Sequence, residues 1–346
     1  MHKYVHHKTD GRQLFLYGHK PNKLTPLPDA EQGVAQGSHA RWHPLRREWV
    51  VYAVHRQTRT FLPPKEFCPL CPSRPDGLPT DIPFENFEIA VFQNRWPSLS
   101  PRAGEAPRDL PVLTREANGD CEVVVFTPEH NGSLGTISQE RRELLVRVWA
   151  DRYQELYSRP EIQYVMPFEN RGELIGVTMH HPHGQIYAYP FVPPVAEREA
   201  GSFRESPALL NLLASAKSYT VLEDQHCLAM IPPFARFPYE VLVYPKKFHP
   251  GPWTFSDDEV KSFAFMLGEV VRRYDKLFEQ PFPYILLLHA APKGEEARFH
   301  FHAEFNAYLR TKDKLKYLAG TEVGAGTFAV DALPEETAKV LREVRP

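Results

Sequence analysis

Three histidines stand within four residues of the stretch GVTMHHPHGQIYAYP, at positions 180, 181 and 183. Residues two apart on a strand point to the same side, so His181 and His183 are predicted to lie next to each other. Pro182 favours a strand end or edge, and Gly184 lets the backbone come close to a ligand there. A neutral imidazole that keeps its proton on one ring nitrogen can attack phosphorus with the other. The alternative is a pair of half-buried histidines with structural hydrogen bonds only.

Two cysteines form a C-x-x-C pair in FCPLCP, at Cys68 and Cys71. This spacing suits a metal knuckle, but it supplies only half of a tetrahedral site. His130 and His181 are the candidates for the other two ligands. A redox pair is the alternative, although the flanking prolines favour a tight turn over a helix-borne redox motif. The other two cysteines are predicted to be buried small apolar side chains.

The elements that must position these residues occur twice along the chain. Each copy has an apolar run, a histidine, a Thr-x-Ser, an amphipathic segment, a second apolar run and an H-x-H pair. The same offset of 119 residues separates three pairs of histidines: His130 and His249, His181 and His300, and His183 and His302. The repeat predicts an α+β fold of two tandem units, each an antiparallel sheet packed with helices. The copies differ at H-P-H-G-Q and H-F-H-A-E, as expected if one keeps an attacking group and the other is structural.

Each copy should contain one long helix. The apolar residues recur at the three- and four-residue spacing of an amphipathic helix. The two stripes are Leu145, Trp149, Tyr153 and Leu156, and Val260, Phe263, Leu267, Val270, Tyr274 and Phe278. Ser256 and Glu259 have the spacing of a capping box, which predicts the start of the second helix.

The organisation predicted from these patterns has three parts. Residues 1–37 are predicted to be an appended arm, whose histidine-rich start is expected to be mobile and solvated. Residues 38–195 form an N-terminal catalytic unit and residues 205–346 a C-terminal unit. The joint falls in PPVAEREAGSFRESPA, which is charged and weakly periodic. The 34 prolines predict long, stiff surface loops.

Composition excludes several classes of partner. The 346 residues carry a formal charge of -2 and are 42% hydrophobic. That balance gives no pull toward nucleic acid or an acidic membrane surface. No run approaches the ~20 apolar residues of a membrane span, and the first residues have no apolar signal core. We therefore expect a soluble cytoplasmic protein that binds neither nucleic acid nor membrane.

The combination of motifs is specific. FENRGELIGVTMHHPHGQIYAYP, with FCPLCP and VFTPEH upstream, resembles the galactose-1-phosphate uridylyltransferase family, the transferase branch of the histidine-triad superfamily. RWHPLRREWVVYAVHRQTR, FQNRWPSL and HAAPKGEEARFHFHAEF extend the resemblance over about residues 38 to 335. It implies a histidine-triad-like half-barrel in each unit. It also implies a ping-pong reaction, in which UDP-glucose gives UMP to a histidine and galactose 1-phosphate then takes it.

The resemblance also implies roles for residues. His183 would be the nucleophile, with Gln185 beside it, and His181 would hold it through a backbone carbonyl. In zinc-bearing members His181 would also bind a structural zinc ion with Cys68, Cys71 and His130. The implied substrate-binding residues are Arg56, Arg59, Asn94, Asn170, Thr178, Gln185, Lys316 and Glu322. A second metal, iron or zinc in some members, would map to Glu199, His289, His302 and Glu304.

Members of the family are homodimers that share active sites, and they work without magnesium at the reaction centre. We therefore expect a homodimer and no Mg²⁺ there, since the chain has no obvious carboxylate cluster to hold it. Two features depart from the family. Thr321 and Phe328 replace a tyrosine and a glutamine near the sugar, and Arg95-Trp96 stands where an acidic-aromatic pair is common.

Alternatives to the uridylyl reaction follow from these departures. One is a related nucleotidylyl-histidine enzyme such as an ADP-glucose phosphorylase, with another base or acceptor. Another is a catalytically silent nucleotide-binding protein, against which the complete H-P-H-G-Q argues. A zinc-dependent hydrolase would need an open metal position, which a Cys₂His₂ site lacks.

Overall fold

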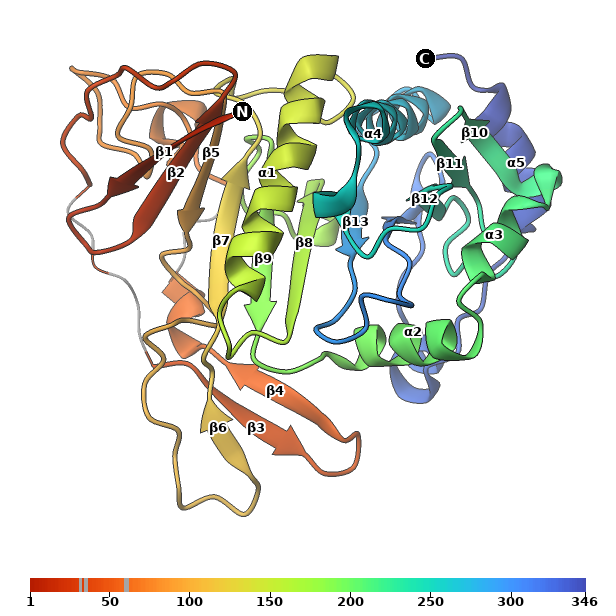
Figure 1. Ribbon diagram of the computed structural model, residues 1–346, viewed down its shortest axis with the longest axis horizontal. Coiled ribbons are helices and arrows are strands. Elements are labelled where there is room, and N and C mark those ends of the chain that lie inside the picture. The colour runs from red at the N-terminus through yellow and green to blue at the C-terminus, as the bar shows by residue number, and fades with distance from the viewer. Residues whose placement is uncertain (31–32, 34–36, 59–61) are drawn as a thin grey trace.

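The computed structural model describes residues 1–30, 33, 37–58 and 62–346. Within these residues one antiparallel sheet of 11 strands forms the centre of the molecule (Figure 1). Its strands, in spatial order, are β1 (His2–His7), β2 (Gln13–Gly18), β5 (Ile89–Gln93), β7 (Asp120–Val125), β9 (His183–Tyr189), β8 (Tyr164–Arg171), β13 (Tyr284–His289), β14 (His302–Ala307), β12 (Val241–Pro245), β11 (Cys227–Met230) and β10 (Thr220–Glu223).

Smaller elements surround this sheet. A three-stranded side sheet consists of β4 (Glu48–Tyr52), β3 (His39–His43) and β6 (Thr114–Glu116). A two-stranded ribbon consists of β15 (Leu309–Thr311) and β16 (Lys314–Leu315). The α-helices are α1 (Gln139–Tyr157), α2 (Pro194–Glu205), α3 (Leu209–Ala214), α4 (Asp257–Leu277) and α5 (Pro334–Glu343). None of the helices in the described part of the chain is long and apolar enough to cross a bilayer.

The internal repeat is present in the strand register. Glu122 faces Ile186 between β7 and β9, and the residues 119 positions later, Val241 and Phe305, face each other between β12 and β14. The same shift turns the β8–β9 register into the β13–β14 register. The predicted α+β fold of two histidine-triad-like units is therefore confirmed, strand by strand, around each H-x-H pair.

The two units share one sheet and one main core. β8 of the first unit pairs with β13 of the second, with Leu287 opposite Phe168. α1 and α4 pack against each other and cover one face of the sheet (Figure 1). The predicted apolar stripes of both helices face this core, and Ser256 and Glu259 form the predicted capping box. Cys121 and Cys227 are buried, as expected.

One expectation about the ends of the units is wrong. The start of the chain is not a mobile terminus, because β1 pairs with β2 over its whole length and β2 pairs with β5. The predicted joint contains α2, which begins with Pro194 in its first turn and buries Ala196, Ala200 and Phe203. Proline at that position is compatible with a helix because the first amide protons have no helical partner. The boundaries 38–195 and 205–346 stay a prediction.

Alternation along the strands separates the core face from an open face. On β9 the even residues Gly184, Ile186 and Ala188 are buried toward the helices, while His183 and Gln185 point the other way. β14 repeats this arrangement, with Ala303 and Phe305 in the core. On these strands the side chains predicted to do chemistry therefore lie on the face opposite α1 and α4.

Candidate active site

β9 begins at His183, so His181 precedes the strand and the two histidines have different surroundings. His181 is buried, and its Nε2 lies 2.7 Å from the carbonyl oxygen of Thr127. A carbonyl only accepts hydrogen bonds, so Nε2 carries the proton and Nδ1 carries the lone pair. This bond fixes the His181 ring and directs Nδ1 toward the cysteine pair.

His183 is held by the backbone of His181. Its Nδ1 donates to the His181 carbonyl oxygen at 2.7 Å, which leaves Nε2 with the lone pair. Burial lowers the pKa of His183 below its ordinary value of 6.5, because desolvation disfavours the charged ring. The ring is therefore neutral at pH 7, as a nucleophile toward phosphorus must be.

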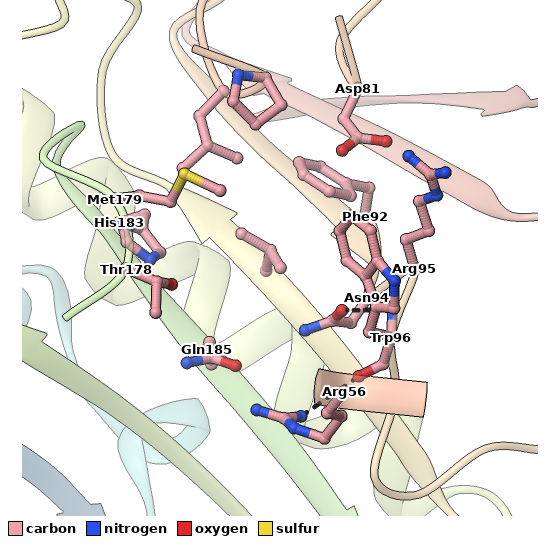
Figure 2. A pocket seen from close by; sticks show the side chains of 13 residues that line it. Arg56, Asp81, Phe92, Asn94, Arg95, Trp96, Thr178, Met179, His183 and Gln185 are labelled. Carbon is pink, nitrogen blue, oxygen red and sulfur yellow. Dashed lines mark hydrogen bonds between the residues drawn. The ribbon is translucent and has the colours of Figure 1, made fainter. Parts of the chain in front are cut away.

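A cavity of about 620 Å³, including space open to solvent, lies in front of His183 (Figure 2). Five residues expected at the site line it: Arg56, Asn94, Thr178, His183 and Gln185. Apolar side chains and an indole also line it: Leu70, Phe92, Trp96, Val123 and Met179. Asp81 and Arg95 line it across from His183 (Figure 2). Donors near His183 beside apolar walls suit a ligand with a phosphate at one end and a flat ring at the other.

Arg56 is fixed rather than free. Its Nη1 donates to the Trp96 carbonyl at 3.2 Å, to Ser98 Oγ at 3.0 Å and to the Tyr187 hydroxyl at 3.0 Å. These bonds hold the guanidinium at the cavity wall, where it can complement negative charge. Arg59, the second arginine expected to bind phosphate, lies outside the described residues.

Asn170 lines a different cavity from the one described above. It stands two residues after Phe168 on β8, and His183 lines both cavities.

The cysteine pair and two histidines form the predicted cluster. One ligand atom from each of Cys68, Cys71, His130 and His181 lies within 4.8 Å of the others. Cys71 Sγ is 3.4 Å from His130 Nδ1 and 3.5 Å from His181 Nδ1. A hydrogen bond from Cys71 lowers the pKa of Cys68, so one thiolate is already favoured. Two sulfur and two imidazole ligands fit zinc, and the CxxC segment is a turn, as predicted.

A second cluster lies at the corresponding place of the other unit. Glu199, His289 and His302 bring ligand atoms within 4.8 Å of one another. His302 Nδ1 faces the His300 carbonyl at 3.0 Å, as His183 faces that of His181. Burial lowers the pKa of His302 to about 4, which keeps it neutral. Within the described part of the chain the buried His289 Nε2 has no hydrogen-bond partner, and its Nδ1 lies 3.0 Å from Glu199 Oε2, so these residues fit a metal ion.

Glu304, the fourth residue expected there, has another contact. One of its oxygens is paired with Arg236, while the other lies 3.8 Å from His289 Nε2. Its part in a metal site stays a prediction. No sequence motif around Arg236 predicts this ion pair.

Lys316 and Glu322 are not among the described residues that line either cavity of His183. They are buried in an ion pair with each other, and Lys316 Nζ also donates to the Ala329 carbonyl at 2.8 Å. The backbone amides of Ala319 and Ala329 donate to Glu322 as well. Their predicted contact with substrate stays a prediction.

The close packing at Gly184 gives a direct test of how β9 positions His183. A Cβ there would lie 2.7 Å from the Phe168 carbonyl oxygen and 3.0 Å from the Phe126 ring. We expect Gly184→Ala to cost about 1–3 kcal/mol of unfolding free energy and to displace His183. Urea unfolding measures the first effect. Gly320→Ala is the control, because among the described residues no atom beyond its chain neighbours lies within 4 Å of an added Cβ, and its φ is -58°. An equal loss there would contradict the packing argument.

Comparison with known proteins agrees with this geometry. Residues 30–193 match the family described as galactose-1-phosphate uridyl transferase, N-terminal domain, and residues 208–345 match its C-terminal domain. Galactose-1-phosphate uridylyltransferase of Thermotoga maritima is 40% identical over 315 residues, which is 88% of this chain and 97% of that protein.

Solved structures share the fold. A uridylyltransferase superposes with a TM-score of 0.78 at 28% identity, covering 88% of this chain and 97% of the other. An ADP-glucose phosphorylase from Arabidopsis thaliana, with bound ADP-glucose, gives a TM-score of 0.67 at 23% identity, covering 90% and 99% of the two chains. The latter likeness concerns the fold alone.

Proposed function

The chain belongs to the galactose-1-phosphate uridylyltransferase family, and we propose that it transfers UMP from UDP-glucose to galactose 1-phosphate through a covalent bond to His183. The observation that carries the covalent step is the hydrogen bond from His183 Nδ1 to the His181 carbonyl. It leaves a neutral ring with its Nε2 lone pair beside the donors of the cavity.

In the first step Nε2 attacks the α-phosphorus of UDP-glucose. A phosphorus–nitrogen bond forms, the bond to the bridging oxygen breaks, and glucose 1-phosphate leaves with the electron pair. The Nδ1 proton stays on the ring, where the His181 carbonyl stabilises the positive charge that develops. Arg56 and Gln185 are placed to complement the charge on the phosphoryl oxygens.

In the second step a phosphate oxygen of galactose 1-phosphate attacks the same phosphorus. The phosphorus–nitrogen bond breaks, UDP-galactose leaves, and His183 returns to its neutral form. Because His183 borders two cavities, the nucleotide can stay in one while the sugar phosphates exchange through the other.

Zinc is the metal we assign to Cys68, Cys71, His130 and His181. When bound it would be structural, because the protein supplies all four ligands of a tetrahedral site. His181 then has three contacts to keep: the metal through Nδ1, Thr127 through Nε2, and His183 through its carbonyl. The second metal and the homodimer with shared sites stay predictions.

The half-reaction without acceptor tests the proposal. We expect UDP-glucose alone to release up to one glucose 1-phosphate per active site and to leave a UMP-sized mass gain on the intact protein. Adding galactose 1-phosphate should remove the gain and produce UDP-galactose. Glucose 1-phosphate formation that requires galactose 1-phosphate, with no adduct at any time, would contradict the two-step mechanism.

A parallel incubation with ADP-glucose tests the alternative nucleotide. An AMP-sized gain in place of the UMP gain would assign the chain to an adenylyl reaction. No gain with either nucleotide would favour a silent nucleotide-binding protein.

A further inference from the structure

The second cluster, formed by Glu199, His289 and His302, offers one carboxylate and two imidazoles. Glu199 Oε2 lies 3.0 Å from His289 Nδ1, and Glu199 Oε1 lies 3.9 Å from His302 Nε2. The two imidazole rings are stacked, with their centres 5.0 Å apart and their planes 7° apart. His289 is only 2% exposed, and within the described part of the chain its Nε2 has no hydrogen-bond partner. This set of donors suits a divalent cation.

Glu304 borders this cluster without joining it. Its Oε2 lies 3.8 Å from His289 Nε2, which is beyond hydrogen-bond distance. Among the described residues, Glu304 is not one of those whose ligand atoms all lie within 4.8 Å of one another. Its Oε1 is paired with Arg236 instead, and Glu304 is buried, so this ion pair is screened less than a surface pair. A cation would have to compete with Arg236 for the carboxylate.

Arg236 is kept at this place by several contacts. Its backbone amide donates to Glu240 Oε2 at 2.7 Å, and its Nε lies 3.6 Å from the same oxygen. Its guanidinium lies 5.3 Å from the centre of the Phe328 ring, and that ring packs against Phe237 at 6.0 Å. Phe328 is one of the residues that depart from the family. The contacts hold the guanidinium beside Glu304.

The internal repeat shows that both charges are particular to the second unit. The residue 119 positions before Glu304 is Gln185, and the residue 119 positions before Arg236 is Ala117. Both are neutral, so the second unit has one added negative charge and one added positive charge, and the two are in contact. A carboxylate facing a cation would add its charge to the site, whereas the pair with Arg236 adds none.

We propose that Arg236 holds Glu304 away from the ion of the second site, which therefore binds a divalent cation through the three residues of the second cluster alone. Three protein ligands leave a coordination position open, and water or a small anion can take it. The side chains of Glu199 and Arg236 are 23% and 37% exposed, so solvent reaches this side of the cluster. The inference concerns the second unit and does not rest on the uridylyl transfer.

Mn²⁺ tests this on the full-length protein with zinc retained in the cysteine cluster, because thiolates select softer ions. Electron paramagnetic resonance of free Mn²⁺ gives the dissociation constant, and the relaxation of water protons reports exchangeable water on the bound ion. We expect the native protein to bind Mn²⁺ with enhanced relaxation, and His302→Gln to abolish this binding. Arg236→Gln should bind Mn²⁺ about 10-fold more tightly and lose the enhancement, because the released Glu304 carboxylate fills the open position. Residues that contact a metal ligand from outside change metal affinity by about 10- to 100-fold.

Two further variants interpret the result. The double variant Arg236→Gln, Glu304→Gln removes both charges and should return to the native dissociation constant and enhancement. Arg310→Gln is the matched control, because Arg310 is also 37% exposed and pairs with a carboxylate, Asp331, outside the cluster. It should change neither quantity. Unchanged or weaker binding by Arg236→Gln overturns the inference. So does a native protein that shows no His302-dependent Mn²⁺ binding, or one that binds Mn²⁺ without enhanced relaxation.

Discussion

His183→Asn is expected to abolish the covalent adduct and to reduce kcat/KM for the complete reaction by at least about 10⁴-fold, since it removes the attacking nitrogen itself. Asparagine can still donate a hydrogen bond toward the His181 carbonyl, so the local fold should survive. Intact-protein mass after incubation with UDP-glucose should show no gain, while the thermal midpoint should stay near that of the native chain.

His180→Asn is the matched control for this prediction. His180 is adjacent in sequence but half-exposed, and its ring lies 3.3 Å from Glu173 at the surface. We expect this variant to form the adduct normally. Adduct formation by His183→Asn at the native rate would assign the nucleophile to another residue.

Cys71→Ser should have the largest effect on stability. Cys71 Sγ contacts both histidines of the cluster, and a serine hydroxyl is a poor replacement for a thiolate ligand of zinc. We expect the variant to lose its bound zinc and about 4 kcal/mol or more of unfolding free energy, as is usual when a structural metal is lost. Metal analysis and denaturant unfolding measure the two effects. Adduct formation should also slow, because His181 loses a contact that orients its carbonyl toward His183.

Cys121→Ser separates metal loss from the cost of a buried hydroxyl. Cys121 is buried outside the cluster, and its Sγ accepts a hydrogen bond from the Leu99 amide at 3.4 Å. We expect this control to keep its zinc and to cost about 1–2 kcal/mol. A Cys71→Ser protein with native metal content and stability would instead favour a redox pair.

The parts of the fold that sequence could predict are those whose signal is local. The stripes of α1 and α4 and the capping box at Ser256 depend on residues a few positions apart. The constant offset between the H-x-H pairs could also be predicted from the sequence. It implies the same strand register in both units, because register follows from the alternation of side chains within each strand. The metal cluster came from the types of four residues, and the structure brings those four together.

What the sequence could not predict depends on contacts between distant segments. The N-terminal hairpin looks solvated in sequence, since four of the six residues of β1 are histidine or lysine. Asp10 pairs with Arg12 locally, but the burial of Lys8 and Arg12 also depends on Asp81, about 70 residues further on, which accepts hydrogen bonds from both. Glu304 could not be assigned for the same reason: Arg236 approaches it from another loop. The sequence alone does not show which distant residue will pair with a given charged side chain.

The junction between β8 and β13 has a consequence for the origin of the chain. Leu287 stands 119 positions after Phe168 and directly faces it, so the strand pairing there is isologous, as across the axis of a symmetric dimer. Two identical subunits joined in this way would carry two identical sites. Once the two are fused into one polypeptide, the residues of the second site can change without changing those of the first. Asn170, His183 and Gln185 correspond to His289, His302 and Glu304, so the residues proposed for catalysis in one unit take the places of the ion-binding candidates in the other, while the axis that relates them has survived.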